Sequence, residues 1–448
     1  MHRRDFIRTG TVAAAGFTIL PSGAVFGRAA EKVKLGYIGV GERGRNHINE
    51  GLLRDDVEIV AICDIAEDSL KSTRAMFTKA GKKLPKEYTG GVDAYKELLN
   101  RKDIQGVIIS TPWEYHKDQS IDAMKAGKYV GCEVIAGITL DDHWDIVKTS
   151  EQTGMPYMTL ENVCYRRDVM AVLNMVRQNL FGEIIHLEGG YQHDLRGVLF
   201  NDGKSPYGKG AKYGKDGYSE ARWRTEWNMK RNGDLYPTHG AGPVMHYADI
   251  NYGNRFTNLV SFGSKSRGLQ DYVKSIDPNN PVVKADVKNS DVSTTVLNCA
   301  NGETVVISHD VHLPRPYSLG FRVQGTQGIW MDVNDSIYIE GKSEKHDVWD
   351  KADIWLEKYD HPLWKKYAAK AEGAGHGGMD WFVFNAFVES VKRKKQTPID
   401  VYDSVTMSAI TPLSETSVQN GNAPQEFPDF TGGKWKDRKT TFALNDDY

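Results

Sequence analysis

Three glycines with a spacing suited to phosphate binding give the first indication of chemistry in this chain. Gly39, Gly41 and Gly44 are spaced G-x-G-x-x-G directly after an apolar run. Such glycines permit a tight turn, leave room for a pyrophosphate and let a helix pack closely on a strand. A second apolar run ends at Asp64, twenty positions after Gly44, where a carboxylate can bind ribose hydroxyls. The pattern predicts a dinucleotide site, and Asp64 favours NAD because a carboxylate repels the 2′-phosphate of NADP.

The elements that would position these residues alternate between strand-like and helix-like segments. Alternation of this kind predicts a doubly wound parallel sheet with helices on both faces, a Rossmann domain in the α/β class. Such a sheet binds its ligand at the carboxyl ends of its strands, so the residues where strands stop are candidates for the site. The predicted strands are 33–40, 57–63, 104–111, 129–134 and 156–161, and the predicted helices are 65–80, 92–100, 117–126 and 140–154.

The pattern of predicted helices and strands changes near residue 166. One helix is predicted over 168–181, and consecutive strand-like runs then follow without regular helices between them. This pattern indicates a C-terminal α+β domain with an open, mostly antiparallel sheet. Its strand-like runs are 184–192, 259–262, 293–299, 304–309 and 321–323, with loops over 201–218 and 341–378. We therefore expect a signal segment at 1–30, an NAD-binding domain at 31–162 and a substrate-binding, catalytic domain at 163–448.

The N-terminus carries a paired arginine followed by a weakly hydrophobic run. Arg3 and Arg4 precede this run, which Pro21 interrupts, and small residues extend to Ala30. The pattern predicts a twin-arginine export signal and a periplasmic protein that leaves the cytoplasm already folded. The run is too short and interrupted for a membrane anchor in the mature form. A net charge of -2 and 40% hydrophobic residues indicate a soluble globular enzyme without a nucleic-acid partner.

Neither a metal site nor a redox motif is predicted. The four cysteines show no C-x-x-C spacing, so we expect neither a zinc site nor a required disulfide. The pairs His309 with His312 and His239 with His246 lack a carboxylate at ligand spacing. The aromatic pair in 223–227 could stack on a sugar, although residues four apart more often pack on a helix.

The ends of the third and fourth predicted strands resemble a known superfamily. The segments 110–116 and 126–133, with the glycine motif, are similar to the glucose–fructose oxidoreductase and inositol dehydrogenase superfamily. Its ordinary dehydrogenases carry Glu-Lys-Pro where this chain has Glu133-Val134-Ile135, and a valine cannot relay the proton of an alcohol. The cofactor-binding residues implied are Gly39, Gly41, Glu42, Arg43, Gly44, Asp64, Trp113, Glu114, Tyr115, His116, Glu133, Val134 and Asn162.

Longer motifs in the second half resemble glycoside hydrolase family 109. They cover 161–168, 190–194, 235–240, 315–321, 373–378 and the ending 442–448, so the similarity runs from about residue 33 to the end. Known members are NAD-dependent α-N-acetylgalactosaminidases that cleave terminal sugars without net redox change. The resemblance implies oxidation at C3, loss of the C2 proton, elimination of the C1 group, addition of water and return of the hydride. It also implies a tightly bound NAD that is recycled within each turnover.

Residue roles follow from this resemblance. His376, which is flanked by glycines, protonates the leaving group and later activates water, and histidine titrates near neutral pH. His239 contacts the sugar hydroxyls and relays the C3 proton. Tyr165 lies beside two arginines that could lower its pKa, so either Tyr165 or His239 removes the C2 proton. The implied substrate-binding residues are Tyr191, Arg224, Tyr236, Pro237, Thr238, His239 and Tyr317.

Two alternatives remain open at this stage. One is an exported NAD-dependent sugar oxidoreductase of the glucose–fructose oxidoreductase type, against which Val134 argues. The other is a non-catalytic sugar-binding protein with a structural NAD, against which His376 argues. The expected partners are a glycan or glycoconjugate substrate and the twin-arginine export machinery. The aglycone, the galacto or gluco preference and the oligomeric state, a homo-oligomer included, are left open by the sequence.

Overall fold

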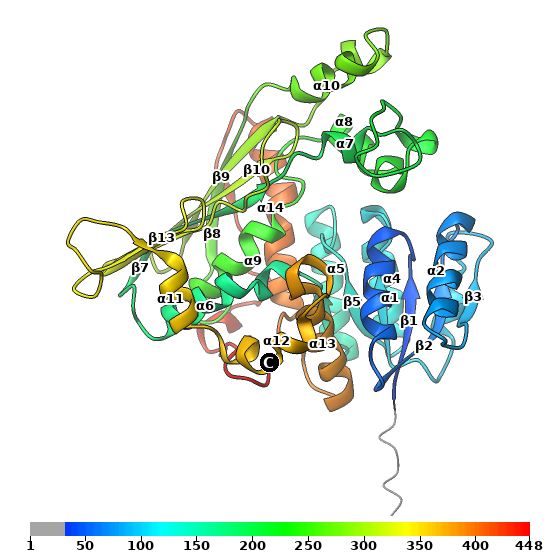
Figure 1. Ribbon diagram of the computed structural model, residues 1–448, viewed down its shortest axis with the longest axis horizontal. Coiled ribbons are helices and arrows are strands. Elements are labelled where there is room, and N and C mark those ends of the chain that lie inside the picture. The colour runs from blue at the N-terminus through cyan, green and yellow to red at the C-terminus, as the bar shows by residue number, and fades with distance from the viewer. Residues whose placement is uncertain (1–31) are drawn as a thin grey trace, which may run out of the picture.

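Two sheets form the framework of the molecule (Figure 1). The computed structural model describes residues 32–448. The predicted export signal at Arg3 and Arg4 therefore lies outside the described residues. Buried aliphatic and aromatic side chains from both halves of the chain form one large continuous core, with a small satellite cluster around Trp113.

The first sheet confirms the predicted Rossmann architecture. Its six strands have the order β3-β2-β1-β4-β5-β6, and every neighbouring pair is parallel. Only β3, three residues long, was not predicted. The strands are β1 (Val33–Ile38), β2 (Val57–Cys63), β3 (Lys86–Tyr88), β4 (Gly106–Ile109), β5 (Tyr129–Cys132) and β6 (Tyr157–Thr159). The helices between them are α1 (Glu42–Leu52), α2 (Glu67–Lys79), α3 (Tyr95–Leu99), α4 (Trp113–Lys125) and α5 (Leu140–Thr153).

The second sheet is mixed and mostly antiparallel, as predicted. Its order is β14-β13-β12-β11-β7-β10-β9-β8-β15, and β7 with β10 is its parallel pair among the described residues. The strands are β7 (Ile184–Gln192), β8 (Phe256–Gly263), β9 (Val292–Cys299), β10 (Thr304–Asp310), β11 (Arg322–Gly325), β12 (Gly328–Met331), β13 (Ser336–Ile339), β14 (Asp350–Lys351) and β15 (Gln425–Glu426).

The expectation that the second half has few regular helices is wrong. Two long helices, α13 (Met379–Arg393) and α14 (Val401–Gln419), lie near its end, and most residues of both are buried. A helix buried on all sides has no polar stripe, so the sequence lacks the periodicity that reveals a surface helix. The other helices are α6 (Arg167–Arg177), α7 (Arg196–Leu199), α8 (Arg224–Lys230), α9 (Thr238–Tyr247), α10 (Gly268–Ile276), α11 (Ala352–Lys358) and α12 (Pro362–Ala371).

Helix α13 belongs to the second half of the sequence but packs on the first sheet. A Cβ atom on Gly106 or Gly131 would lie 3.1 or 3.2 Å from the ring of Phe387. These two strand glycines leave room for the aromatic ring. The predicted boundary at residue 162 therefore divides the sequence, while α13, from beyond that boundary, packs on the first sheet. Helix α14 contacts β6 of the first sheet and β8 of the second.

Three further features bear on the predictions. All four cysteines are buried and free. Within residues 32–448, no group of three or more His, Cys, Asp or Glu side chains could hold a metal ion. No helix in that same part of the chain is both long and apolar enough to cross a membrane.

Candidate active site

A cavity of about 480 Å³ lies at the carboxyl ends of the Rossmann strands, where the sequence predicts a dinucleotide. Gly39 has φ +85, and a Cβ atom there would lie 2.7 Å from the Ser110 backbone. A Cβ atom on Gly44 would lie 2.2 Å from the carbonyl oxygen of Gly39. Both positions therefore require glycine for the tight turn and the close helix packing that the motif implies.

The residues around this cavity fit NAD. The first N–H groups of α1 have no acceptor within the helix, so they can bind phosphate oxygens. Asp64 is held at the cavity wall by the N–H groups of Val40 and Ala66, which donate to its carboxylate at 2.7 and 2.8 Å. Of the predicted cofactor residues, Gly39, Gly41, Glu42, Arg43, Asp64, Trp113, Glu114, Tyr115, His116, Glu133 and Val134 line the cavity.

The Arg43 side chain, which lies within the glycine motif in sequence, makes ion pairs with two carboxylates. Its guanidinium donates to Glu133 at 2.6 Å and to both oxygens of Asp380 at 2.8 and 3.0 Å. The Nε2 atom of His47 lies 2.6 Å from the same Glu133 carboxylate. Burial raises the pKa of Glu133, but Arg43 and His47 outweigh burial and hold it at about 2. Arg43 and Glu133 therefore join α1 to β5 and α13 in addition to lining the cavity.

His116 and Asn162 take part in hydrogen bonds within the protein. Each ring nitrogen of His116 lies 2.7 Å from a backbone carbonyl oxygen, of Ile135 or Thr111. Burial lowers the pKa of His116, but the neighbouring Cys132 and the two carbonyls outweigh it and raise it to about 9. Asn162 donates to Asp380 and, like Gly44, is absent from the cavity lining.

Two histidine–carboxylate pairs are linked through consecutive residues just after β6. Glu161, which is fully buried, lies 2.7 and 2.9 Å from Nδ1 of His239. The next residue, Asn162, donates at 2.8 Å to Asp380. That carboxylate lies 2.8 Å from Nδ1 of His376. Because both carboxylates accept from Nδ1, each histidine keeps Nε2 for proton exchange with a ligand.

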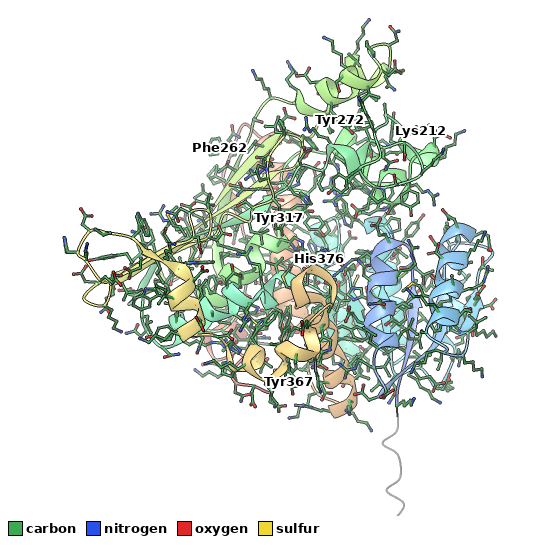
Figure 2. The ribbon with its side chains drawn as sticks, viewed as in Figure 1. Lys212, Phe262, Tyr272, Tyr317, Tyr367 and His376 are labelled. Atoms are coloured by element: carbon green, nitrogen blue, oxygen red, sulfur yellow. The ribbon has the colours of Figure 1, made fainter. Side chains whose placement is uncertain are left out.

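The Asp380 carboxylate is anionic. Burial raises its pKa, but Arg43 and His376 outweigh burial and hold the pKa far below its usual range. His376 itself has φ 52, and its side chain is 52% exposed. Its position on the turn before α13 is labelled in Figure 2. A buried anion thus orients a histidine that solvent or a ligand can reach.

Aromatic rings surround His239. The rings of Tyr191 and Tyr236 stack at 4.6 Å, and each meets the His239 ring edge-on, at 5.1 and 4.9 Å. The Arg224 guanidinium lies 4.6 Å from the Tyr236 ring centroid and 5.4 Å from that of Trp113. Pro237 and Thr238 begin helix α9 and so fix the position of His239. Aromatic faces suit the C–H faces of a pyranose, and a guanidinium can donate to its hydroxyls.

Tyr317 lies at the exposed edge of this aromatic group. It is labelled in Figure 2 and is 48% exposed. Its ring meets the His193 ring edge-on at 5.0 Å. The Nδ1 atom of His193 lies 3.3 Å from the hydroxyl of Tyr191. His193 therefore connects two of the predicted substrate-binding tyrosines.

The structure does not place Tyr165 at this site. Its ring is fully buried between Phe382 and Phe442, and its hydroxyl has no hydrogen-bond partner among the described residues. Burial raises the pKa of Tyr165 well above its usual range, so the expectation that Arg166 and Arg167 lower it is wrong. The two cations bind Asp168 and Asp360 instead. A buried phenol of this kind is a poor proton acceptor.

Sequence reasoning missed the two carboxylates that orient the histidines. Glu161 is the last residue of the predicted strand 156–161, where the Rossmann topology already predicts functional residues. Asp380 lies four positions after His376, but His376 has φ 52 on the turn before α13, so helical spacing does not predict this contact. Both histidine–carboxylate pairs therefore depend on the tertiary fold.

The fold and the site together define a two-domain enzyme with an NAD-binding Rossmann domain. Residues 33–159 match the oxidoreductase family model described as an NAD-binding Rossmann fold. Residues 165–437 match the model of the glycosyl hydrolase 109 C-terminal domain. The chain belongs to glycosyl hydrolase family 109 and is a glycoside hydrolase that uses NAD.

Relatives of similar length support this assignment. A glycosyl hydrolase family 109 protein from Stenotrophomonas maltophilia is 55% identical over 454 aligned residues, covering 100% of this chain and 99% of the relative. A protein from Tannerella forsythia named alpha-N-acetylgalactosaminidase is 48% identical, covering 93% of this chain and 90% of the relative.

Solved structures share the fold at low sequence identity. A levoglucosan dehydrogenase in complex with NADH and levoglucosan has a TM-score of 0.65 and 15% identity, covering 89% of this chain and 100% of that one. A myo-inositol 2-dehydrogenase from Lactobacillus plantarum has a TM-score of 0.61 and 14% identity, with the same coverage. At these identities the comparison supports the fold alone.

Proposed function

We propose that this enzyme hydrolyses terminal α-linked N-acetylgalactosamine from glycans by an oxidation–elimination–addition–reduction cycle without net redox change. The observation that carries the proposal is the pair of carboxylate-held histidines linked through Glu161 and Asn162. Two residues that line the cofactor cavity contact this pair, Arg43 through Asp380 and Tyr236 through the His239 ring. Such a cycle requires proton transfers at several sugar positions, and two oriented histidines supply side chains that can accept and donate these protons. The name of the Tannerella forsythia relative supports the sugar specificity.

His239 is the proposed proton acceptor on the oxidation side. Bound NAD⁺ would supply the chemistry of accepting a hydride from C3 of the sugar and returning it at the end of the cycle. His239 takes the C3 hydroxyl proton through Nε2 and passes it to solvent. Once C3 is a ketone, the freed Nε2 takes the acidified C2 proton. The anionic Glu161 on Nδ1 stabilises the imidazolium that forms. With Tyr165 in the core, His239 is the remaining one of the two predicted C2 bases.

His376 is the proposed proton donor on the leaving-group side. As the C1–O bond breaks, Nε2 of His376 protonates the departing oxygen, and the electron pair of the C2–H bond forms the C1–C2 double bond. His376 then takes a proton from the water that adds to C1, while C2 regains a proton. Asp380 fixes the ring for both transfers. Every proton removed is returned, so sugar and alcohol are released with no net oxidation.

One incubation separates this function from its main alternative. The purified protein is mixed with p-nitrophenyl α-N-acetylgalactosaminide without added nucleotide, and phenolate and NADH are followed together. The proposed cycle gives many turnovers of phenolate with no accumulation of NADH. A sugar oxidoreductase instead gives NADH in proportion to sugar consumed and needs added NAD⁺. Absence of phenolate with nucleotide fully bound would favour a non-catalytic sugar-binding protein.

Retention of the cofactor and export are further parts of this proposal. A nucleotide that left during the cycle would strand an oxidised sugar, so NAD is proposed to remain bound between turnovers. The twin arginines Arg3 and Arg4 support export of the folded, loaded enzyme to the periplasm, where it meets glycan substrates.

A further inference from the structure

A short segment of the C-terminal domain forms part of the lining of the cofactor cavity. We call residues 218–223, between the loop at Gly217 and helix α8, the strap. Of these residues, Tyr218, Ser219, Glu220, Arg222 and Trp223 line the same cavity as Gly41 and Asp64 of the Rossmann domain. In Figure 1 the green segment that carries α7 and α8 lies above α1, α2 and α4. One wall of the NAD site therefore comes from the C-terminal domain.

Hydrogen bonds hold the strap to both helices that border the nucleotide site. Arg222 donates to Asp68, in the first turn of α2, at 2.8 and 3.4 Å. The Ser219 hydroxyl donates to Glu42, the first residue of α1, at 2.8 Å. These contacts join residues 154 and 177 positions apart in sequence. They lie beside the helix N-termini where the phosphates and the ribose of a dinucleotide bind.

The strap is also fixed at its own ends. Asn201 exchanges two hydrogen bonds with the Tyr218 backbone, at 3.0 and 3.1 Å. At the other end Trp223 packs edge-on against Trp113 at 5.0 Å, which places it beside the cavity wall. Ser219 has φ 53, a left-handed conformation that costs a non-glycine residue energy and that neighbouring contacts must maintain. The strap is therefore a positioned segment and not an incidental loop.

We propose that the strap is a clasp that retains NAD, with the Arg222–Asp68 ion pair and the Ser219–Glu42 hydrogen bond as its closing contacts. This inference rests on the proposed function, which needs the nucleotide to stay bound through every turnover. Release of NAD from this cavity requires the clasp contacts to open, so their strength sets the release rate. The last residue of the strap, Trp223, is followed directly by Arg224, which is one of the predicted substrate-binding residues.

The release rate of the nucleotide tests the clasp without measuring catalysis. The full-length protein is loaded with radiolabelled NAD⁺, chased with excess unlabelled NAD⁺ and sampled by filter binding. Arg222→Ala should release label up to about fivefold faster, the upper end for an ion pair exposed to water. The matched control is Arg74→Ala, because Arg74 also lies on the α2 side and pairs with Glu67 and Glu87 outside the cavity. Its release rate should equal that of the wild type.

A charge reversal distinguishes a clasp from direct contact between Arg222 and the nucleotide. The double variant Arg222→Asp, Asp68→Arg should return release to within about twofold of the wild-type rate, because the ion pair is rebuilt in reverse. Added salt should accelerate release from the wild type and have little effect on Arg222→Ala, since ions screen an exposed pair. Three results would overturn the clasp. Arg222→Ala could release NAD at the wild-type rate, Arg74→Ala could accelerate release as much as Arg222→Ala does, or salt could still accelerate release from Arg222→Ala.

The clasp and the proposed function can fail separately. If the wild type hydrolyses no α-N-acetylgalactosaminide yet the variants release NAD faster, the glycosidase proposal fails and the clasp stands. If hydrolysis is normal and every strap variant keeps its nucleotide like the wild type, the clasp is wrong and the function stands.

Discussion

Replacing His376 by alanine should separate proton transfer to the leaving group from the oxidation chemistry. General acid catalysis by a positioned side chain contributes about 10²–10⁴-fold. The His376 side chain is half exposed, and its partner Asp380 already shares its charge with Arg43, so water can replace part of the function. We therefore expect a loss of about 10²–10³-fold in kcat/KM on a sugar–sugar linkage, which is about 3–4 kcal/mol of transition-state stabilisation. An aryl glycoside, whose phenolate leaves without a proton, should lose less than about tenfold.

The assay for this variant uses two substrates and one exchange measurement. Cleavage of an N-acetylgalactosamine disaccharide and of its p-nitrophenyl glycoside is compared, and exchange of the C2 proton in deuterated water is followed by NMR. The control is His186→Ala, which removes another histidine paired with a carboxylate, Glu188 at 3.0 Å, on the second sheet. C2 exchange should persist in His376→Ala. A loss of C2 exchange as large as the loss of cleavage would refute the assignment and move His376 to the deprotonation step.

Four further predictions follow from named contacts. Tyr165→Phe should keep kcat/KM within about twofold and leave the melting temperature unchanged or higher, since the lost hydroxyl has no partner among the described residues; a large loss of activity would restore Tyr165 as a catalytic residue. Asp64→Ala should weaken NAD binding by about 1–3 kcal/mol in a direct titration, and unchanged affinity would mean that the ribose acid is misplaced. Glu133 has a pKa near 2 in the folded protein against an ordinary 4.5, so its stabilisation is complete above pH 4.5 and is lost as pH falls toward 2. Glu133→Gln should therefore cost about 3 kcal/mol of unfolding free energy at pH 7 in denaturant titrations, and a wild-type value would contradict the Arg43–His47 network. Replacing Arg3 and Arg4 by lysine should leave active enzyme in the cytoplasmic fraction, and continued export would exclude the twin-arginine route.

The Rossmann half was predictable because its local patterns agree with its tertiary structure. Strand β2 has the predicted bounds, 57–63, and the glycines at 39 and 44 occupy positions where a side chain would clash with backbone. Each of these features depends on a short stretch of sequence, in which apolar runs, glycines and a terminal acid stand in a fixed order.

The helices of the second half could not be predicted by the same means. Residues of α14 are buried on nearly every side and include Pro412, so no apolar stripe marks the helix. Asp400 caps its first turn, which is the one local signal that sequence reasoning could have used. Segment 341–378 was expected to be a loop because it is rich in glycine, yet it contains α11 and α12. Their burial against other elements outweighs local propensity.

The candidate site was predictable in its residue types and less so in its roles. Histidines and tyrosines in glycine-rich motifs indicated a polar ligand, and the structure gathers Tyr191, Tyr236 and His239 within about 5 Å of one another. The misassignment of Tyr165 arose because neighbours in sequence, Arg166 and Arg167, were assumed to be neighbours in space. The guanidinium groups of Arg166 and Arg167 pair with the carboxylates of Asp168 and Asp360 instead.

The closed redox cycle is the central claim, and isotopic labelling at C3 tests it most directly. An α-N-acetylgalactosaminide carrying deuterium at C3 is hydrolysed in ordinary water, and the released sugar is analysed by mass spectrometry and NMR. The same experiment is repeated with unlabelled substrate in deuterated water. The account predicts that the product keeps its C3 deuterium, because the same hydride is returned, and gains solvent deuterium at C2. Loss of the C3 deuterium would contradict the return of the same hydride. Hydrolysis without solvent deuterium at C2 would contradict the cycle and indicate a direct displacement at C1.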